Sequence, residues 1–167
     1  MHLAIRPADR DEVAALADLA RRTYADAFGA SMSAPDLAHH LAHRLSDEYF
    51  RGALDRDVIL VAALAGRSVG FVQFGPAGRE PGAVEIRRLY VDAGCRNRGI
   101  GGQLMAAALA HPTALGARRV YLDVWEDNRA AQRFYRRFGF AEVDAHPIEL
   151  ASGPSRGRDL VLARQKG

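Results

Sequence analysis

Glu85-Ile86-Arg87-Arg88-Leu89-Tyr90-Val91, followed after a short spacer by Arg96-Asn97-Arg98-Gly99-Ile100-Gly101-Gly102, is the stretch that decides the fold. The first part has the apolar character of a strand, and the second opens an amphipathic helix. Glycine lets the backbone approach a ligand closely, and the start of a helix favours an anion. Arg96 and Arg98 can add charge-assisted bonds to phosphate oxygens. The junction therefore predicts a phosphate-binding loop.

The loop at 96–102 matches neither of two common phosphate motifs. A P-loop needs Gly-x-x-x-x-Gly-Lys followed by Ser or Thr, and no lysine occurs here. The dinucleotide fingerprint Gly-x-Gly-x-x-Gly fails as well, because the spacing is Arg-x-x-Gly-x-Gly-Gly and the loop lies in mid-chain. A plain glycine-rich turn, with arginines facing water, is the simpler alternative.

The two stretches resemble the fourth strand and the coenzyme A loop of the GNAT superfamily of acyl-coenzyme A dependent N-acyltransferases. Asn128-Arg129-Ala130-Ala131, followed by Phe134-Tyr135 and Phe138-Gly139-Phe140, resembles the closing helix and strand of that family. The resemblance implies an α/β fold with a mixed, mainly antiparallel sheet of six to seven strands and about four helices. Near its centre the sheet would contain a small parallel portion that splays in a V.

Length and composition agree with such a domain. A chain of 167 residues, 49% apolar and 26% charged, predicts a single domain over 1–167. No apolar stretch approaches the roughly 18 residues that a membrane span needs, and the N-terminus lacks the layout of a signal peptide. The single cysteine, Cys95, excludes an internal disulfide. We therefore expect a cytoplasmic protein with no membrane partner.

The net charge of +3 and the isoelectric point near 9.4 come from arginine, since Lys166 is the sole lysine. A basic protein can bind nucleic acid through phosphates. Here the arginines are scattered, and the densest group brackets the predicted loop: Arg87, Arg88, Arg96 and Arg98. A polyanionic cofactor such as coenzyme A explains that group, and no nucleic-acid partner is expected.

Local patterns predict the elements of the first half of the chain. Asp9 and Glu12 form a capping box for a helix, and a second helical region over Ala34–Leu54 is expected to break near Ser46. The strands expected here lie at Leu3–Arg6, at Val58–Leu64 and Val69–Phe74 (a hairpin turning at Gly66), and at Val84–Val91.

In the second half, Pro112 predicts that the helix after the loop stops or kinks near Ala110, because proline removes a hydrogen bond and clashes inside a helix. Asn128 is expected to cap the next helix, and Gly139 to follow its end. The remaining strands are expected at Val120–Val124, Phe140–Val143 and Asp159–Leu162.

The resemblance assigns acetyl-CoA as co-substrate. Backbone groups near Leu89–Val91 would bond the pantetheine arm, and one N–H would polarise the thioester carbonyl. The full set of residues expected to bind the cofactor is Leu89, Tyr90, Val91, Arg96, Asn97, Arg98, Gly99, Ile100, Gly101, Gly102, Gln103, Asn128, Ala131 and Tyr135.

Two residues are candidates for proton transfer. Tyr135 matches the family's tyrosine that protonates the leaving thiolate, although its spacing equally suits packing with Phe134 and Phe138. Glu85 is the candidate base for the amine, and the alternative is a carboxylate paired with Arg87 two residues along the strand. Whether Glu85 acts directly or through a water chain is left open.

A metal site is not expected. His39 and His43 lie one helical turn apart, but two histidines without an acidic or cysteine partner at matching spacing are a weak signal. A solvated helix face explains them, so acetyl-CoA is the sole cofactor predicted.

The sequence is compatible with several classes of acyl acceptor. Outer regions around Thr23–Gly29 and Val124–His146 resemble PaiA-type spermidine/spermine N-acetyltransferases. Where those relatives carry an acidic turn, Ser152–Arg158 contains two arginines, which would repel a polyamine. A polyamine, another small-molecule amine and a peptide N-terminus are all candidates. A non-catalytic module that binds acyl-CoA is the alternative to an enzyme, and a homodimer is a further expectation.

Overall fold

The structure is a computed structural model that describes residues 2–167, and the side chains of 154–156 lie outside the description. The chain divides into two compact units. Unit 1 contains the residues up to Phe74 together with Arg88–Ala110, and unit 2 contains Gly75–Arg87 together with His111–Gly167. A single domain over 1–167 stays a prediction.

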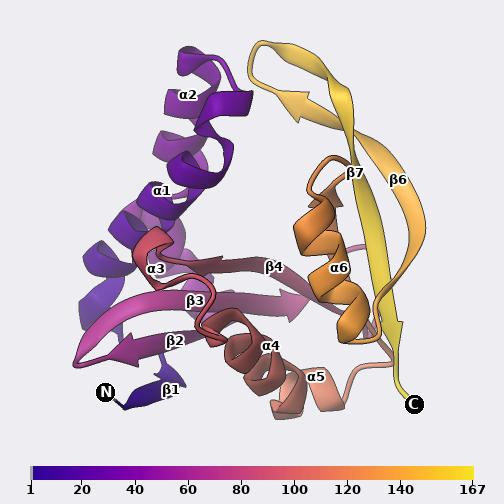
Figure 1. Ribbon diagram of the computed structural model, residues 1–167. Helices are drawn as coiled ribbons and strands as arrows, with labels where there is room; N and C mark the ends of the chain where they lie inside the picture. The colour runs from indigo at the N-terminus through magenta and orange to yellow at the C-terminus, as the bar shows by residue number, and fades with distance from the viewer. Residues whose placement is uncertain (1) are drawn as a thin grey trace. The chain divides into compact units, whose positions relative to one another are not determined.

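A mixed sheet of seven strands runs through the chain in the order β1-β2-β3-β4-β5-β7-β6 (Figure 1). The recorded pairings are antiparallel except for β4 with β5, which run parallel. This confirms the expected mainly antiparallel sheet with a parallel portion. The strands are β1 (Leu3–Pro7), β2 (Val58–Leu64), β3 (Arg67–Pro76), β4 (Val84–Val91), β5 (Arg119–Trp125), β6 (Ala141–Leu150) and β7 (Gly153–Gln165).

The parallel pairing is short in the recorded register. Val84, Glu85 and Ile86 of β4 face Val120, Tyr121 and Leu122 of β5. All six residues belong to unit 2, whereas the rest of β4 beyond Arg87 belongs to unit 1. The expected V-shaped splay of these two strands beyond Ile86 stays a prediction.

Unit 1 contains four of the α-helices, and the predicted capping signals are present in it. The backbone N–H of Asp9 donates to Glu12 at 2.8 Å, which completes the capping box ahead of a 3-10 turn and α1. Ser46 accepts a hydrogen bond from the N–H of Tyr49 at 3.0 Å, so the helical region does break at Ser46. The helices are α1 (Val13–Phe28), α2 (Ala34–Arg44), α3 (Asp47–Arg56) and α4 (Ile100–Ala110).

The core of unit 1 lies between α1, α3 and strands β2 and β3. Leu16 and Ala20 of α1 are buried, and Phe50 meets Phe71 edge-on with ring centroids 5.8 Å apart. Burial of large apolar side chains in this way is the main stabilising contribution to folding. The core thereby fixes β3, and β4 is held against β3 at the next position of the sheet.

At one position of unit 1, two neighbouring strands approach so closely that only glycine fits. A Cβ atom at Gly70 of β3 would lie 2.8 Å from the carbonyl oxygen of Tyr90 on β4. Contacts this short force the backbone to shift, so a side chain at position 70 would push β4 away. Gly70 therefore sets the spacing between β3 and the part of β4 that precedes the predicted loop.

Unit 2 contains two helices, α5 (Pro112–Leu115) and α6 (Arg129–Arg137). Helix α4 ends at Ala110, and the His111 ring then accepts a hydrogen bond from the N–H of Thr113 at 3.2 Å as the cap of α5. This confirms the stop predicted from Pro112. Gly139 follows α6 with φ of +87°, as the predicted residue after its end. The described residues form six α-helices, where about four were expected.

The last two strands are much longer than the sequence pattern indicates. The expected segments Phe140–Val143 and Asp159–Leu162 are parts of β6 and β7, which pair as a long antiparallel hairpin. Most of β6 is exposed, so it lacks the apolar alternation by which strands are recognised. Pro147, at an irregularity of the register, further weakens the signal. Among the described residues, no helix is long and apolar enough to cross a membrane.

Candidate active site

The residues predicted for the site fall into one set in each unit. Unit 1 holds the end of β4, from Leu89 to Val91, and the loop with the start of α4, from Arg96 to Gln103. Unit 2 holds Glu85 with the helix residues Asn128, Ala131 and Tyr135. In unit 1 these residues follow one another along β4, the loop and α4, whereas in unit 2 Glu85 lies on β4 and the other three belong to α6 or its cap.

The loop in unit 1 has the backbone expected of an anion cradle. Asn97 and Gly99 have φ of +62° and +75°, in the left-handed region, and α4 begins directly afterwards at Ile100. The N–H groups in the first turn of a helix have no intrahelical acceptor and point towards its N-terminal end. Asn97, Arg98 and Gly99 are exposed, so these donors are accessible to a ligand.

Asp92 anchors the loop to the rest of unit 1, a role that no local sequence pattern predicts. Its buried carboxylate accepts a hydrogen bond from Arg67 at 3.0 Å and pairs with Arg22 at 3.4 Å. Its carbonyl accepts from the N–H of Cys95 at 2.8 Å, and its own N–H donates to Val69 at 2.8 Å. These bonds hold the entry of the loop, so little conformational entropy is left to lose when a ligand binds.

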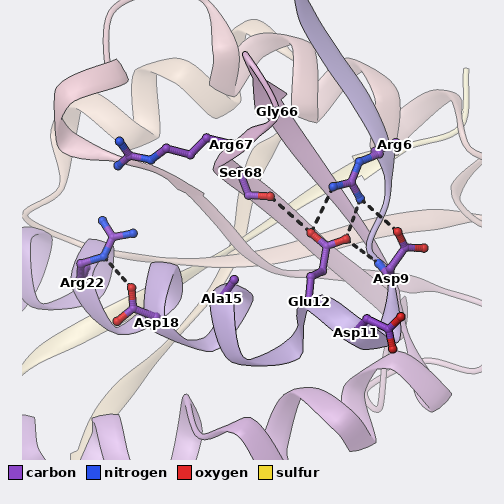
Figure 2. A pocket seen from close by; sticks show the side chains of 10 residues that line it. All are labelled: Arg6, Asp9, Asp11, Glu12, Ala15, Asp18, Arg22, Gly66, Arg67 and Ser68. Atoms are coloured by element: carbon purple, nitrogen blue, oxygen red, sulfur yellow. Dashed lines mark hydrogen bonds and ion pairs between the residues drawn. The ribbon is translucent and has the colours of Figure 1, made fainter.

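The same region contains a polar hollow of about 590 Å³ beside α1 and the β2–β3 turn (Figure 2). Glu12 lies at its centre and accepts hydrogen bonds from Arg6 at 2.6 Å and from Ser68 at 3.3 Å. Burial alone would raise the pKa of Glu12, but the bonds from Arg6, Asp9 and Ser68 outweigh it and lower that pKa. The residues that line the hollow include none predicted for catalysis or cofactor binding, and the role indicated is structural.

In unit 2, Asn128 caps α6 as predicted, with its side-chain oxygen accepting from the N–H of Ala131 at 3.2 Å. The turn before α6 is held by Gln132, which sequence reasoning missed. Its buried amide donates to the carbonyls of Trp125 at 3.2 Å and Glu126 at 2.8 Å. A polar residue on a helix gives no pattern from which such a contact could be predicted.

Tyr135 lies in the third turn of α6 and packs edge-on against Phe134 and Phe140, with centroids 5.4 and 6.2 Å away. Burial raises its pKa to about 12, so the phenol is protonated throughout the physiological range. Its hydroxyl has no hydrogen-bond partner among the described residues. Both expectations from the sequence are therefore compatible with the structure: the ring packs, and the O–H can still donate.

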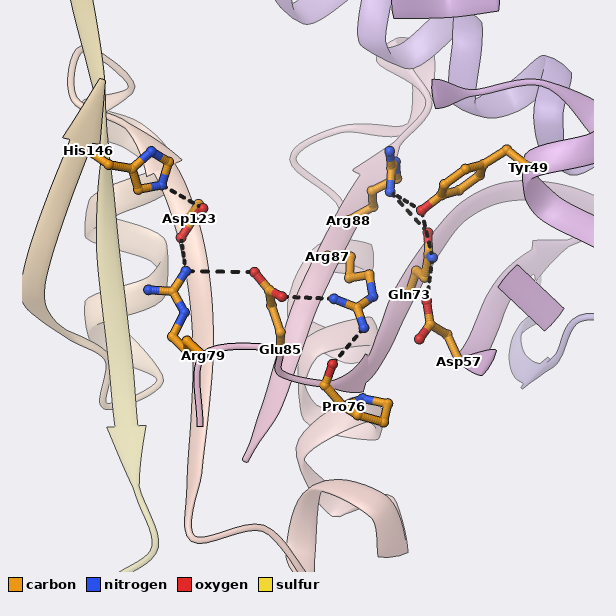
Figure 3. Close-up of polar contacts among 10 residues, drawn as sticks. All are labelled: Tyr49, Asp57, Gln73, Pro76, Arg79, Glu85, Arg87, Arg88, Asp123 and His146. Atoms are coloured by element: carbon orange, nitrogen blue, oxygen red, sulfur yellow. Dashed lines mark hydrogen bonds and ion pairs between the residues drawn. The ribbon is translucent and has the colours of Figure 1, made fainter. Parts of the chain in front are cut away.

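Glu85 lies in a chain of charged residues on unit 2 (Figure 3). Arg87 donates to its Oε2 at 2.8 Å, and Nη2 of Arg79 lies 4.0 Å from its Oε1. Arg79 also donates to Asp123 at 3.2 Å, and Asp123 contacts the His146 ring at 3.0 Å. The predicted pair with Arg87 is thus present. A carboxylate held at one oxygen can still accept a proton at the other, so the pair and the base role are not exclusive.

Three potential metal ligands meet on β5, β6 and β7. Ligand atoms of Asp123, His146 and Asp159 all lie within 4.8 Å of one another. The hydrogen bond with Asp123 raises the pKa of His146, and burial together with the charge of Asp123 raises the pKa of Asp159. An imidazolium between two carboxylates compensates much of their charge without an ion. The expectation that no metal is used stays a prediction.

His39 and His43 lie on α2 as expected, with ring centroids 4.3 Å apart, and both are exposed. They do not belong to the group formed by Asp123, His146 and Asp159. Sequence spacing could not reveal that group, because its members come from three strands and meet only through the β5–β7–β6 register. A search for short-range ligand patterns would miss it.

Comparison with known proteins gives a consistent family. The model of the Acetyltransferase (GNAT) family matches residues 14–140. An uncharacterised N-acetyltransferase of Mycobacterium tuberculosis is 32% identical over 159 residues, which is 94% of this chain and 97% of that protein. The spermine/spermidine N(1)-acetyltransferase of Bacillus subtilis is 32% identical over 81 residues, covering 45% of this chain and 53% of that protein.

Solved structures show the same fold. The PaiA N-acetyltransferase of Thermoplasma acidophilum, crystallised with coenzyme A, superposes with a TM-score of 0.83 at 19% identity, over 99% of this chain and 100% of that one. The ribosomal-protein-S18-alanine N-acetyltransferase of Escherichia coli gives a TM-score of 0.75 at 16% identity, over 98% and 94% of the two chains. The family model spans well over half of the sequence, and the fold agrees with it. The chain therefore belongs to the GNAT family, whose members use acetyl-CoA, and it is an N-acetyltransferase.

Proposed function

We propose that this enzyme transfers the acetyl group of acetyl-CoA directly to the primary amine of a small molecule or peptide. The observation that carries the proposal is the loop at 96–102, with left-handed Asn97 and Gly99 leading into the free N-terminus of α4. Arg96 and Arg98 are both exposed beside these donors. A pyrophosphate group is the ligand that such a cradle suits best.

The remaining predicted residues have separate roles in the proposed reaction. Backbone groups of Leu89–Val91 hold the pantetheine arm and polarise the thioester carbonyl. The carboxylate of Glu85 takes the proton of the acceptor ammonium, directly or through water, and the freed amine attacks the carbonyl carbon. The bond from that carbon to sulfur then breaks, and the leaving thiolate takes a proton from Tyr135.

The protonation state of Tyr135 supports its part in this scheme. A phenol whose pKa is raised to about 12 is always protonated at neutral pH, so it can donate a hydrogen bond to a thiolate as soon as that thiolate forms. The thiolate, whose conjugate acid resembles a cysteine of pKa roughly 8.5, is a weaker base than the phenolate, so the proton passes to sulfur as water supplies a proton to the tyrosine oxygen. Asn128 caps α6 and so fixes the helix that carries Tyr135.

A polyamine is one candidate acceptor, supported by the partial similarity to the Bacillus subtilis spermine/spermidine enzyme. Against it stands the segment at 152–158, most of which belongs to β7. Arg158 pairs there with Glu126 at 3.1 Å, and the Arg156 side chain lies outside the described residues. Amino acid derivatives and peptide N-termini are the other candidates. A cytoplasmic location and a homodimer are also proposals.

The test is release of coenzyme A from acetyl-CoA, followed with a thiol reagent, across spermidine, spermine, amino acids, aminoglycosides and short peptides. Saturable turnover with one class supports the proposal and names the acceptor. If nothing is acetylated but acetyl-CoA still raises the melting temperature, the cofactor site stands and the acceptor lies outside the panel. If acetyl-CoA causes no stabilisation, the assignment of the loop at 96–102 is wrong.

A further inference from the structure

Arg88 on β4 is a partly buried cation without a carboxylate partner among the described residues. Its Nη1 donates to the hydroxyl of Tyr49 at 2.8 Å and to Oε1 of Gln73 at 3.3 Å (Figure 3). Its Nη2 donates to the carbonyl of Arg44 at 3.3 Å. All three acceptors are neutral. Its Nε is buried and has no hydrogen-bond partner within the described structure. A partly buried guanidinium in a protein is normally hydrogen-bonded to a carboxylate or a phosphate. Among the described contacts of Arg88 there is no such counter-charge.

The residues around Arg88 hold the guanidinium rigidly. The charged group stacks over the ring of Tyr49, with its carbon 4.7 Å from the ring centroid. Gln73 is fully buried and is itself oriented by Asp57, to which it donates at 2.7 Å. Within this network the carboxylate of Asp57 is joined to Arg88 through the side-chain amide of Gln73. A preorganised fork of this kind loses little entropy when it binds an anion.

The surroundings of Arg88 are electropositive as well as partly dry. His40 on α2 has a pKa lowered to about 4 by burial first, and then by the charges of Arg88 and Arg44. Neutral His40 is stacked on Tyr24, with ring centroids 4.1 Å apart. Among the described contacts of the Arg88 guanidinium there is no aspartate or glutamate of α2 or α3. The electrostatic potential beside the guanidinium therefore favours an anion.

We propose that Arg88 binds a carboxylate of the acyl acceptor, so that the substrate is a small amine that also carries a carboxylate, such as an amino acid or a close derivative. This rests on the proposed function and narrows its acceptor. Arg88 adjoins Leu89, the first of the residues proposed to hold the thioester, on the same strand. The phosphates of coenzyme A are proposed to bind the loop at 96–102. The anion that binds Arg88 is therefore assigned to the acceptor.

The experiment compares acceptors that differ only in the carboxylate: amino acids against their carboxamides and against the corresponding decarboxylated amines. The variants are Arg88→Gln, which removes the charge, and Arg88→Lys, which keeps it but loses the fork. Arg51→Gln is the matched control, since Arg51 is exposed on α3, the helix that carries Tyr49, and the substitution removes the same charge. Thermal unfolding of each variant reports whether Arg88 also holds Tyr49 in place.

We expect the unmodified enzyme to prefer the amino acid over its carboxamide in kcat/KM by about 10- to 100-fold, the range of a charge-assisted pair. Arg88→Gln should abolish that preference, because it lowers kcat/KM for the amino acid far more than for the carboxamide, and it should not raise the KM for acetyl-CoA. Arg88→Lys should keep part of the preference, and Arg51→Gln all of it. If Arg88 had only a structural role, its replacement would lower kcat/KM for both acceptors by the same factor and would leave the ratio of the two values unchanged.

Three outcomes overturn the inference: exclusive turnover of amines without a carboxylate, an equal loss on acid and amide in Arg88→Gln, or a raised KM for acetyl-CoA in that variant. The last would assign the anion to coenzyme A. Binding of N-acetyl amino acids and their amides, measured by calorimetry with coenzyme A present, gives the same comparison without turnover. If no amine is turned over but the N-acetyl amino acids bind more tightly than their amides, the proposed function is wrong and the inference about Arg88 stands. If the acids and the amides bind equally, the inference about Arg88 is wrong.

Discussion

Arg87 donates from Nη1 to Oε2 of Glu85 at 2.8 Å, across two positions of β4. Side chains two apart on a strand lie on the same face, which is why the pair forms. Arg87 also donates to the carbonyl of Pro76 at 2.7 Å, so the guanidinium is fixed from both sides. The candidate base thus has a defined orientation before any substrate arrives.

Glu85→Gln should lower kcat by about 10²- to 10⁴-fold, the usual worth of a positioned general base, with a small effect on the KM for acetyl-CoA. Gln keeps the size and the bond from Arg87 but cannot take a proton. The measurement is the rate of coenzyme A release with saturating acceptor. Arg87→Gln is the comparison: a large loss in it and little loss in Glu85→Gln would leave Glu85 as an orienting partner only.

Tyr135→Phe should lower kcat about 10²-fold while the KM for acetyl-CoA changes little, because the ring still packs and only the donated proton is lost. The melting temperature should hold, since the hydroxyl has no described partner to lose. Tyr121→Phe is the matched control, as that phenol donates to Glu80 at 2.5 Å and has no proposed role in the reaction. An unchanged kcat in Tyr135→Phe would remove the residue from the mechanism.

Gly99 and Gly102 offer a paired test of the loop. Gly99→Ala should destabilise the protein by about 1–2 kcal/mol, the cost of a left-handed alanine, because φ is +75° there. Gly102→Ala has open space around the added Cβ and lies within α4, so it should stabilise the ligand-free protein by up to about 1 kcal/mol. Thermal unfolding checks both values.

The two glycine variants should respond alike to the cofactor. A methyl group at either position intrudes where the backbone is proposed to meet the pyrophosphate, so acetyl-CoA should raise the melting temperature of both variants less than that of the parent. Full ligand stabilisation of Gly102→Ala would show that the phosphates do not approach this turn of α4.

The features predicted correctly from sequence all depend on residues within a few positions of one another. Local hydrogen bonds or local clashes produce the Asp9–Glu12 capping box, the break at Ser46 and the helix stop before Pro112. Such features can be predicted from a short stretch of sequence. The missed features depend on pairing between distant segments. They include the Asp92–Arg67 pair, the Arg88–Tyr49 bond and the extension of β6 along β7.

Residues of the candidate site follow the same division. The loop at 96–102 could be recognised because its glycines, arginines and helix start are contiguous. Arg88 could not be assigned a role, because sequence grouped it with Arg96 and Arg98 while the structure turns it towards Tyr49 and Gln73. Arg96 and Arg98 lie beyond the end of β4, and the side chains of strand neighbours such as Arg87 and Arg88 point to opposite faces, so a cluster of arginines in the sequence did not mean a shared ligand.

His40 should make the protein less stable in mild acid. Its pKa is lowered from 6.5 to about 4 by burial and then by Arg88, Arg44 and His39, so the unfolded chain binds a proton more readily than the folded one. Stability should therefore fall as the pH drops from about 6.5 towards 4, and this residue should add no further loss below that range. Above pH 7 its effect vanishes, because it is neutral in both states.

The measurement is the free energy of unfolding in urea at several pH values between 4 and 8. In His40→Gln the slope over this range should be shallower than in the parent. His43→Gln is the control for the general effect of removing an exposed histidine from the same helix, since His43 is not among the groups that lower the pKa of His40. Arg88→Gln removes one of the charges that oppose protonation, so it should raise the pKa of His40, which its imidazole resonances in an NMR titration would report. Equal slopes in His40→Gln and the parent would mean that His40 is protonated as easily in the folded state as in the unfolded chain.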